Sequence, residues 1–125
     1  RAISVFLDAK VIRNDNRYGI TIVETGIGRL SIPECQFEVG QRFRVRILSD
    51  DVSITLSKSK DSSISNIFKV KVKKIATDSK HMKIITLESG STQIKARITK
   101  KSSEILNLKL NDKVFAQIKT VAITY

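Results

Sequence analysis

Apolar and polar residues alternate along most of this chain with a period of two. The alternation is clearest over residues 43–47, where arginines separate three apolar residues, and over residues 68–73, where lysines do the same. Successive side chains of a β-strand point to opposite faces of the sheet, so this period predicts strands with one buried and one cationic face. We therefore expect a protein built almost entirely of β-strands.

Residues that favour turns divide the alternation into short strands. Gly26 and Gly28 mark a tight hairpin, because glycine supplies the positive φ that such turns need. We expect further turns over residues 13–17, 39–41 and 76–80. The strands expected between the turns cover residues 4–12, 18–23, 29–32, 43–47, 52–56, 66–75, 83–87, 94–98, 114–118 and 121–125.

One segment, residues 100–106, has the character of a helix. It follows Thr99, contains two serines in its first turn and carries Glu104, a combination that is typical of a helix start. We therefore expect a single short helix there.

The two halves of the chain resemble each other, and the first copy carries Asp50 and Asp51 as an insertion. The matching segments are residues 39–47 with 110–118, residues 52–56 with 121–125, and the turns 24–26 with 88–90. This is the pattern of a tandem duplication of a unit of roughly 60 residues. Five short strands in each unit predict an all-β fold of two tandem OB-like five-stranded barrels, with the short helix in the second repeat. We expect the first repeat over residues 1–57, a linker and ligand-binding turn over 58–65, and the second repeat over 66–125.

Composition limits the kinds of chemistry that the chain can perform. A net charge of +11 favours an anionic partner, namely nucleic acid, a membrane surface or a small oxyanion, although solubility alone accounts for the same number. Cys35 and His81 are single residues of their kind, so we expect no internal disulfide and no metal site. The sequence contains no phosphate-binding loop and no nucleophile motif, so we expect no enzyme activity in this chain.

Hydroxyl and ammonium groups gather where strands end. Thr99 lies near Ser102 after one strand, and Lys119 precedes Thr120 after another. A tetrahedral oxyanion offers only acceptors, so it needs converging hydroxyl, N–H and ammonium donors of this kind. The same residues also suit a helix cap and a solvated lysine, and their spacing leaves both interpretations open.

Residues 94–125, with the segments ARIT and IKTVAIT, resemble the C-terminal half of a Mop-type oxyanion-binding domain. The segment SSISNI at residues 62–67 resembles the signature of the same family, but Ser65 stands where the family has arginine. The resemblance implies that the oxyanion is bound by hydroxyl, amide and ammonium groups at matching positions. These candidate site residues are Ser63, Ser65, Asn66, Thr99, Ser102, Lys119 and Thr120.

The order of segments most resembles the regulatory C-terminal domain of the ATP-binding subunit of a molybdate importer. That resemblance implies molybdate or tungstate as ligand, no cofactor, and a homodimer in which two subunits or domains form the sites. It also implies a parent with an ATPase domain before Arg1, which would be a molybdate-transporting ATPase. The parent would contact the membrane subunit of the transporter at the cytoplasmic face of the cell membrane.

Two other functions fit parts of the pattern. A nucleic-acid-binding OB module fits the charge, but Phe43 and Phe68 fall on apolar faces and leave only Tyr18 and Tyr125 to stack on bases. We therefore expect no nucleic acid partner. The serine at position 65 removes a guanidinium, so a dimerisation domain that has lost ligand binding is the other alternative.

Overall fold

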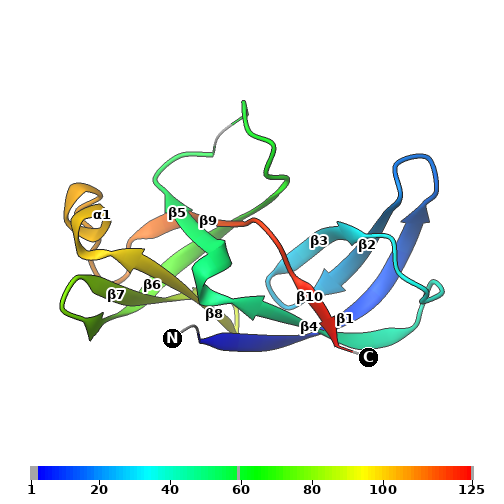
Figure 1. Cartoon of the computed structure of the whole chain (residues 1–125), viewed down its shortest axis with the longest axis horizontal. Coiled ribbons are helices and arrows are strands. Elements are labelled where there is room, and N and C mark those ends of the chain that lie inside the picture. Colours follow the sequence, from blue (N-terminus) through cyan, green and yellow to red (C-terminus); the bar gives the residue numbers. More distant parts are fainter. Residues whose placement is uncertain (1–2, 59, 125) are drawn as a thin grey trace.

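The computed structural model of the chain describes residues 3–58 and 60–124. The described residues form ten strands, one α-helix and one 3₁₀ turn (Figure 1). In chain order the elements are β1 Ser4–Asp15, β2 Ile20–Thr25, β3 Gly28–Pro33, β4 Arg42–Leu48, η1 Ser49–Asp51, β5 Val52–Thr55, β6 Asn66–Ser79, β7 Met82–Ser89, β8 Thr92–Thr99, α1 Lys100–Ile105, β9 Lys113–Ile118 and β10 Ala122–Thr124. The prediction of an all-β fold with one short helix is therefore confirmed. No helix within the described residues is long and apolar enough to cross a membrane.

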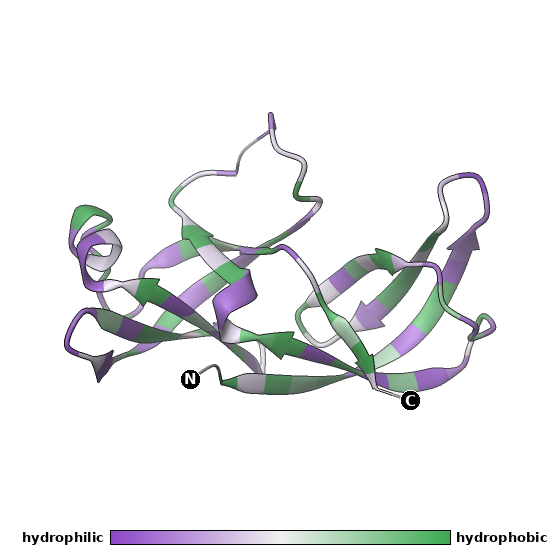
Figure 2. Cartoon of the chain, in the orientation of Figure 1, coloured by the Kyte–Doolittle hydropathy of each residue, from purple (hydrophilic) through white to green (hydrophobic). Residues whose placement is uncertain are grey.

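The alternating pattern explains the strands directly. Strand β4 buries Phe43, Val45 and Ile47 and exposes the arginines between them. Figure 2 shows the result as apolar and polar bands that follow one another along the strands. The expected hairpin is also present, since Thr25 pairs with Gly28 across the turn and Gly28 has a φ of 135°.

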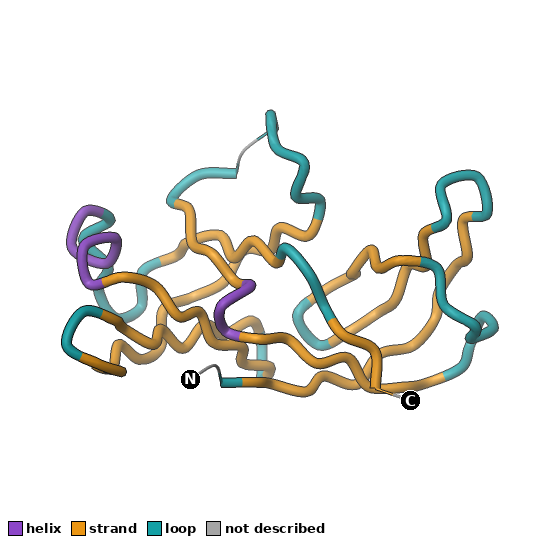
Figure 3. Tube along the Cα trace, in the orientation of Figure 1, coloured by secondary structure: helices purple, strands orange, loops and turns teal. Residues whose placement is uncertain are grey.

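Two segments that we expected to be turns belong largely to strands, and the turns are limited to residues 16–19 and 80–81. Strand β1 continues to Asp15 and strand β6 continues to Ser79 (Figure 3). Each strand has a shift in register, between Val11 and Arg13 in β1 and after Val72 in β6. A bulge of this kind adds a residue and interrupts the period of two, which hides the continuation of the strand from a pattern analysis.

The ten strands form two five-stranded sheets, with the orders β10-β4-β1-β2-β3 and β5-β9-β6-β7-β8. Each sheet takes four strands from one half of the chain and one from the other, because β5 pairs with β9 and β10 pairs with β4. The sheets therefore do not follow the sequence boundaries at residues 57 and 66. The division of the sequence into repeats over residues 1–57 and 66–125 remains a prediction.

One hydrophobic cluster runs through both halves. It contains fully buried side chains from the first half, such as Leu30 and Ile47, together with Ile85 and Ile118 from the second. A unit of roughly 60 residues buries too little surface to be more than marginally stable. The exchanged strands and the shared cluster therefore make the halves depend on each other.

Candidate functional site

Five of the seven candidate residues lie close together where strands β6 and β9 meet. Asn66, the first residue of β6, pairs with Ile118, the last residue of β9. This register brings the segment of Ser63 and Ser65 next to the connection formed by Lys119 and Thr120. We call these five residues the junction group.

The junction group is anchored through its backbone and open at its side chains. The Lys119 N–H donates to the Asp51 carbonyl oxygen at 2.9 Å, which holds the connection against η1. Ser63, Ser65, Lys119 and Thr120 are all exposed, and the Lys119 ammonium forms no ion pair with any described residue. Three hydroxyls and one ammonium are therefore available to an anion at this place.

Asn66 differs from the other members of the junction group. It is buried, its Oδ1 accepts from the Ser31 N–H at 2.8 Å, and its Nδ2 donates to the Ser31 carbonyl at 2.9 Å. The oxygen and the nitrogen of the Asn66 side chain both form hydrogen bonds to strand β3. Asn66 therefore fixes the start of β6 to the other sheet. Its geometry is that of a positioning residue for its exposed neighbours.

Thr99 and Ser102 form the start of helix α1. The Thr99 Oγ1 accepts from the Ser102 N–H at 3.0 Å and donates to the Ser102 Oγ at 2.9 Å. Thr99 is therefore the N-cap of α1, which was one of the two interpretations left open by the sequence. The hydroxyl hydrogen of Ser102 is left to donate outward.

The helix start has cationic neighbours that the sequence analysis did not include among the candidates. Thr99, Lys100 and Lys101 line one surface hollow of about 480 Å³ together with His81. Ser102 lines a second hollow of about 270 Å³ between α1 and strand β5. The pair of lysines was visible in the sequence, but we interpreted it only as part of the helix.

Within one chain, the junction group and the helix start are separate. Thr99 pairs with Met82 at the far end of β8, whereas Lys119 follows β9. Figure 1 shows α1 at one extremity of the molecule and the connection from β9 to β10 near its middle. Among the described residues, no hydrogen bond or ion pair joins the two groups. A single chain therefore does not bring all seven candidates to one point.

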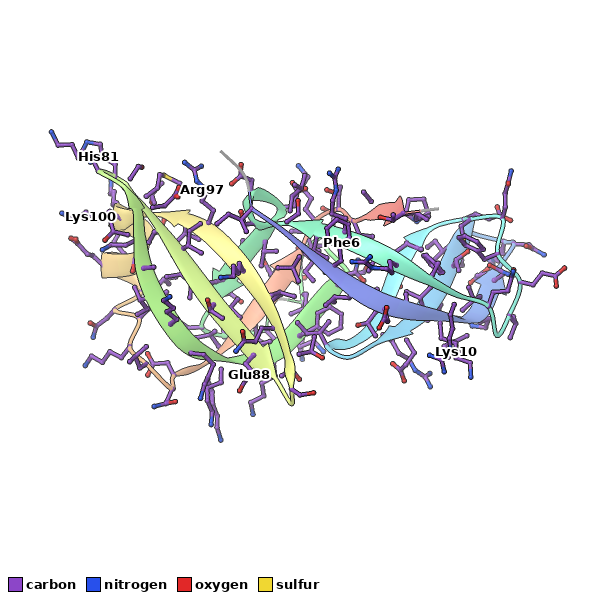
Figure 4. All side chains as sticks on the ribbon, turned by 90° about the horizontal axis from the view of Figure 1, so that it is seen from below. Phe6, Lys10, His81, Glu88, Arg97 and Lys100 are labelled. Carbon is purple, nitrogen blue, oxygen red and sulfur yellow. The ribbon has the colours of Figure 1, made fainter. Side chains whose placement is uncertain are left out.

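Arg97 is the cation most firmly tied to carboxylates. Its Nε donates to the Asp78 carboxylate at 2.8 Å, and its guanidinium lies 3.6 Å from Asp50 (Figure 4). The hydrogen bond to Asp78, together with the nearby Asp50 charge, raises the pKa of Arg97 above its usual value. Since two carboxylates already neutralise it, Arg97 does not replace the guanidinium missing at Ser65.

The described residues of the first repeat offer a poorer set of donors at the equivalent positions. Val5 pairs with Ile47 as Asn66 pairs with Ile118, so an apolar residue takes the place of Asn66. The connection that follows has Leu48 and Ser49 at the positions of Lys119 and Thr120, followed by the inserted Asp50 and Asp51. Leucine supplies no ammonium and the two carboxylates repel an oxyanion, so the second repeat is the better place for an anion.

The aromatic residues agree with their expected places. Phe43 is buried and stacks on Phe37 with ring centroids 4.6 Å apart, and Phe68 packs against the core. Tyr18 is exposed and has the Arg17 guanidinium over its ring at 5.1 Å. Tyr125, the other candidate for stacking, lies outside the described residues.

Together, the two five-stranded sheets, each containing one strand from the other half of the chain, define a tandem OB-like protein whose candidate anion-binding residues lie at strand ends. Residues 62–124 match the TOBE domain family. The chain belongs to this family.

Relatives and a solved structure match nearly the whole chain. Over 122 residues it is 37% identical to the molybdenum import ATP-binding protein ModC of Saccharophagus degradans, a match that covers 95% of this chain and 34% of the relative. Over 116 residues it is 32% identical to ModC of Mesorhizobium japonicum, covering 93% of this chain and 31% of the relative. The chain thus spans about a third of the length of these curated relatives. The crystal structure of the cytoplasmic molybdate-binding protein ModG with molybdate bound has the same fold, with a TM-score of 0.78 at 20% identity, and the match covers 96% of this chain and 93% of that one.

Proposed function

We propose that this chain is the molybdate- or tungstate-binding regulatory domain of a molybdate importer's ATP-binding subunit. The similarity to ModC along 95% of the chain supports this assignment, as does the fold shared with a molybdate-binding protein. In this role the domain senses the oxyanion on the cytoplasmic face of the cell membrane. Catalysis belongs to the ATPase domain of the parent protein, which in turn contacts the membrane subunit of the transporter.

The observation that carries the proposal is the pairing of Asn66 with Ile118. It unites two segments more than fifty positions apart in the sequence, the serine-rich turn before β6 and the Lys119–Thr120 connection. Either segment alone is an ordinary polar loop. Together they offer hydroxyls and an unneutralised ammonium to one anion.

The donors are sufficient for useful affinity. A hydrogen bond to a charged group contributes about 1.5–3 kcal/mol. Three or four such bonds reach the roughly 8 kcal/mol that corresponds to micromolar binding. Without a guanidinium at Ser65, the Lys119 ammonium supplies the only full positive charge among the junction group.

We further propose that the active form is a homodimer. Thr99 and Ser102 are too far along the fold to join the junction group of their own chain. In a dimer, the helix start of one copy completes the junction group of the other. The exposed lysines Lys100 and Lys101 then add positive charge to the shared site.

Calorimetric titration with molybdate, with tungstate and sulfate for comparison, tests the proposal. We expect saturable heat with molybdate and tungstate and far weaker binding of sulfate. Lys119→Ala removes the ammonium and should weaken molybdate binding about 10- to 150-fold. Lys109→Ala, which removes another exposed lysine, is the control and should leave the affinity unchanged. Unchanged affinity in Lys119→Ala would refute the site.

A dimerisation domain that no longer binds a ligand is the second candidate function. The serine at position 65 favours it, because the family signature has a charged residue there. Sedimentation of the domain with and without molybdate separates the two functions. A dimer that neither takes up molybdate nor changes its association with it would support the second.

A further inference from the structure

The outward face of strands β1 and β4 carries three exposed arginines in one line. Arg42, Arg44 and Arg46 alternate with the buried residues of β4. Alternate residues of a strand are about 6.6–6.8 Å apart. We call these three residues the arginine row.

Strands β1 and β10 flank the arginine row on its two sides. Lys10 pairs with Arg42, Asp8 with Arg44 and Phe6 with Arg46, and directly opposed residues share one face of a sheet. Figure 4 shows Phe6 and Lys10 projecting from this face. On the other side of the row, Ala122 lies opposite Arg46 and Thr124 opposite Arg44, and on β2 Glu24 lies opposite Lys10. The face therefore combines four cations with two carboxylates and one aromatic ring, and the second carboxylate lies at the Lys10 end.

The arginine row is not neutralised within the chain. Among the described residues, ion pairs are formed by Arg13, Arg29 and Arg97 and by none of the three row arginines. Asp8 pairs with Arg44 across the strands, yet the two form no ion pair either. The row therefore holds three like charges in line that repel each other and have no ion-pair partner among the described residues.

The middle arginine is held in a defined orientation. The Arg44 guanidinium lies 4.6 Å from the centroid of the Phe6 ring, and Phe6 is 44% exposed. A guanidinium stacked on an aromatic ring keeps its in-plane N–H donors free. Arg44 is thereby prepared for an acceptor with two oxygens, such as a carboxylate.

The second sheet shows that the fold does not require this row. The corresponding positions of β9 are Lys113, Phe115 and Gln117, which pair with Lys71, Lys69 and Ile67 of β6. The same architecture thus forms without a line of arginines. Lysine is the more frequent cation of this chain, whereas the row consists of arginines, whose planar, forked donors suit a carboxylate.

We propose that the arginine row docks an acidic surface of another protein. Such a partner presents carboxylates at strand-like spacing to the row, an apolar group to Phe6 and a donor to Asp8. A nucleic acid fits less well, because the Arg44 guanidinium already occupies one face of the Phe6 ring on which a base would stack.

The test is an NMR titration that follows the backbone amide and arginine Nε–H signals of the chain. The probe is a capped peptide of alternating glutamate and alanine, and its glutamine counterpart is the neutral control. We expect saturable changes at Arg42, Arg44 and Arg46 with the glutamate peptide and none with the glutamine peptide. Changes spread evenly over all lysines and arginines would overturn the proposal.

Matched triple variants separate position from net charge. Arg42→Gln, Arg44→Gln and Arg46→Gln together should weaken binding of the glutamate peptide about tenfold or more. Lys69→Gln, Lys71→Gln and Lys113→Gln remove the same charge from the second sheet and should weaken it less than about twofold. Equal losses in the two variants would overturn the proposal. So would tighter binding of a thymidine oligonucleotide or of phosphatidylserine vesicles through the same three arginines.

Discussion

Replacement of Asn66 by alanine tests whether the two sheets are held together at the point where the donors gather. The Asn66 amide makes two hydrogen bonds to the backbone of Ser31, at 2.8 and 2.9 Å, and the side chain is 8% exposed. Alanine removes both bonds and leaves the Ser31 N–H and carbonyl without partners in a half-buried place.

The size of the effect follows from these two groups. A buried polar group left unsatisfied costs about 1–3 kcal/mol. Ser31 is half-buried, so water reaches it in part, and we expect Asn66→Ala to lower the free energy of unfolding by about 2–4 kcal/mol. That is a large share of the roughly 5–15 kcal/mol that stabilises a domain. The corresponding fall in Tm is about 10 °C.

Urea denaturation followed by circular dichroism measures this loss. Ser63→Ala and Ser65→Ala are the controls, because both serines are exposed neighbours of Asn66 in the sequence. Each should change the free energy of unfolding by less than about 0.5 kcal/mol. A loss below about 0.5 kcal/mol for Asn66→Ala would show that the bonds to Ser31 do not hold the sheets, and would refute the positioning role.

Three further predictions concern a cap, a turn and the site. Thr99→Ala removes the N-cap of α1 and should cost about 1 kcal/mol in urea denaturation, whereas Thr99→Ser should restore most of it; equal values for the two variants would contradict the capping role. Gly28→Ala should cost about 2–4 kcal/mol, because Gly28 has a φ of 135° and a Cβ there would lie 2.8 Å from the Phe68 ring. Thermal unfolding checks this value, and a Tm equal to that of the unaltered chain would contradict it. Ser65→Arg restores the guanidinium of the family signature and should tighten molybdate binding about tenfold or more in calorimetry. An unchanged Kd would show that position 65 does not face the anion.

The strands were predictable because each carries its own information. The run from Phe43 to Ile47 specifies one buried face whichever strands become its neighbours, and Gly28 specifies its turn through its own φ. The ends of β1 and β6 were not predicted, because a bulge in each strand interrupts the alternation of apolar and polar residues.

The exchange of β5 and β10 could not be predicted for a different reason. Strand β5 reads VSIT, and β10 together with the preceding Val121 reads VAIT, so each would suit either sheet by hydrophobic pattern. Only the three-dimensional path of the connections before them decides which sheet each one joins. Sequence similarity between the repeats therefore hides the exchange.

The candidate residues of the site came from the sequence, whereas their grouping is visible only in the structure. Lys119 and Thr120 stand out as polar residues after a strand, and the family resemblance supplied Ser63 and Ser65. The hydrogen bond between Asn66 and Ser31 links residues 35 positions apart, and no local sequence pattern predicts such a contact. The arginine row was visible in the sequence, but that its members lack carboxylate partners is a property of the folded sheet alone.

The exchanged strands also make the polypeptide linker dispensable for holding the molecule together. A protease that cuts between β5 and β6 leaves β5 hydrogen-bonded to β9 and β10 hydrogen-bonded to β4. Each fragment then keeps a strand inside the sheet of the other, so the nicked protein remains one particle until it unfolds. Separation of the two halves therefore requires β5 to leave β9 and β10 to leave β4.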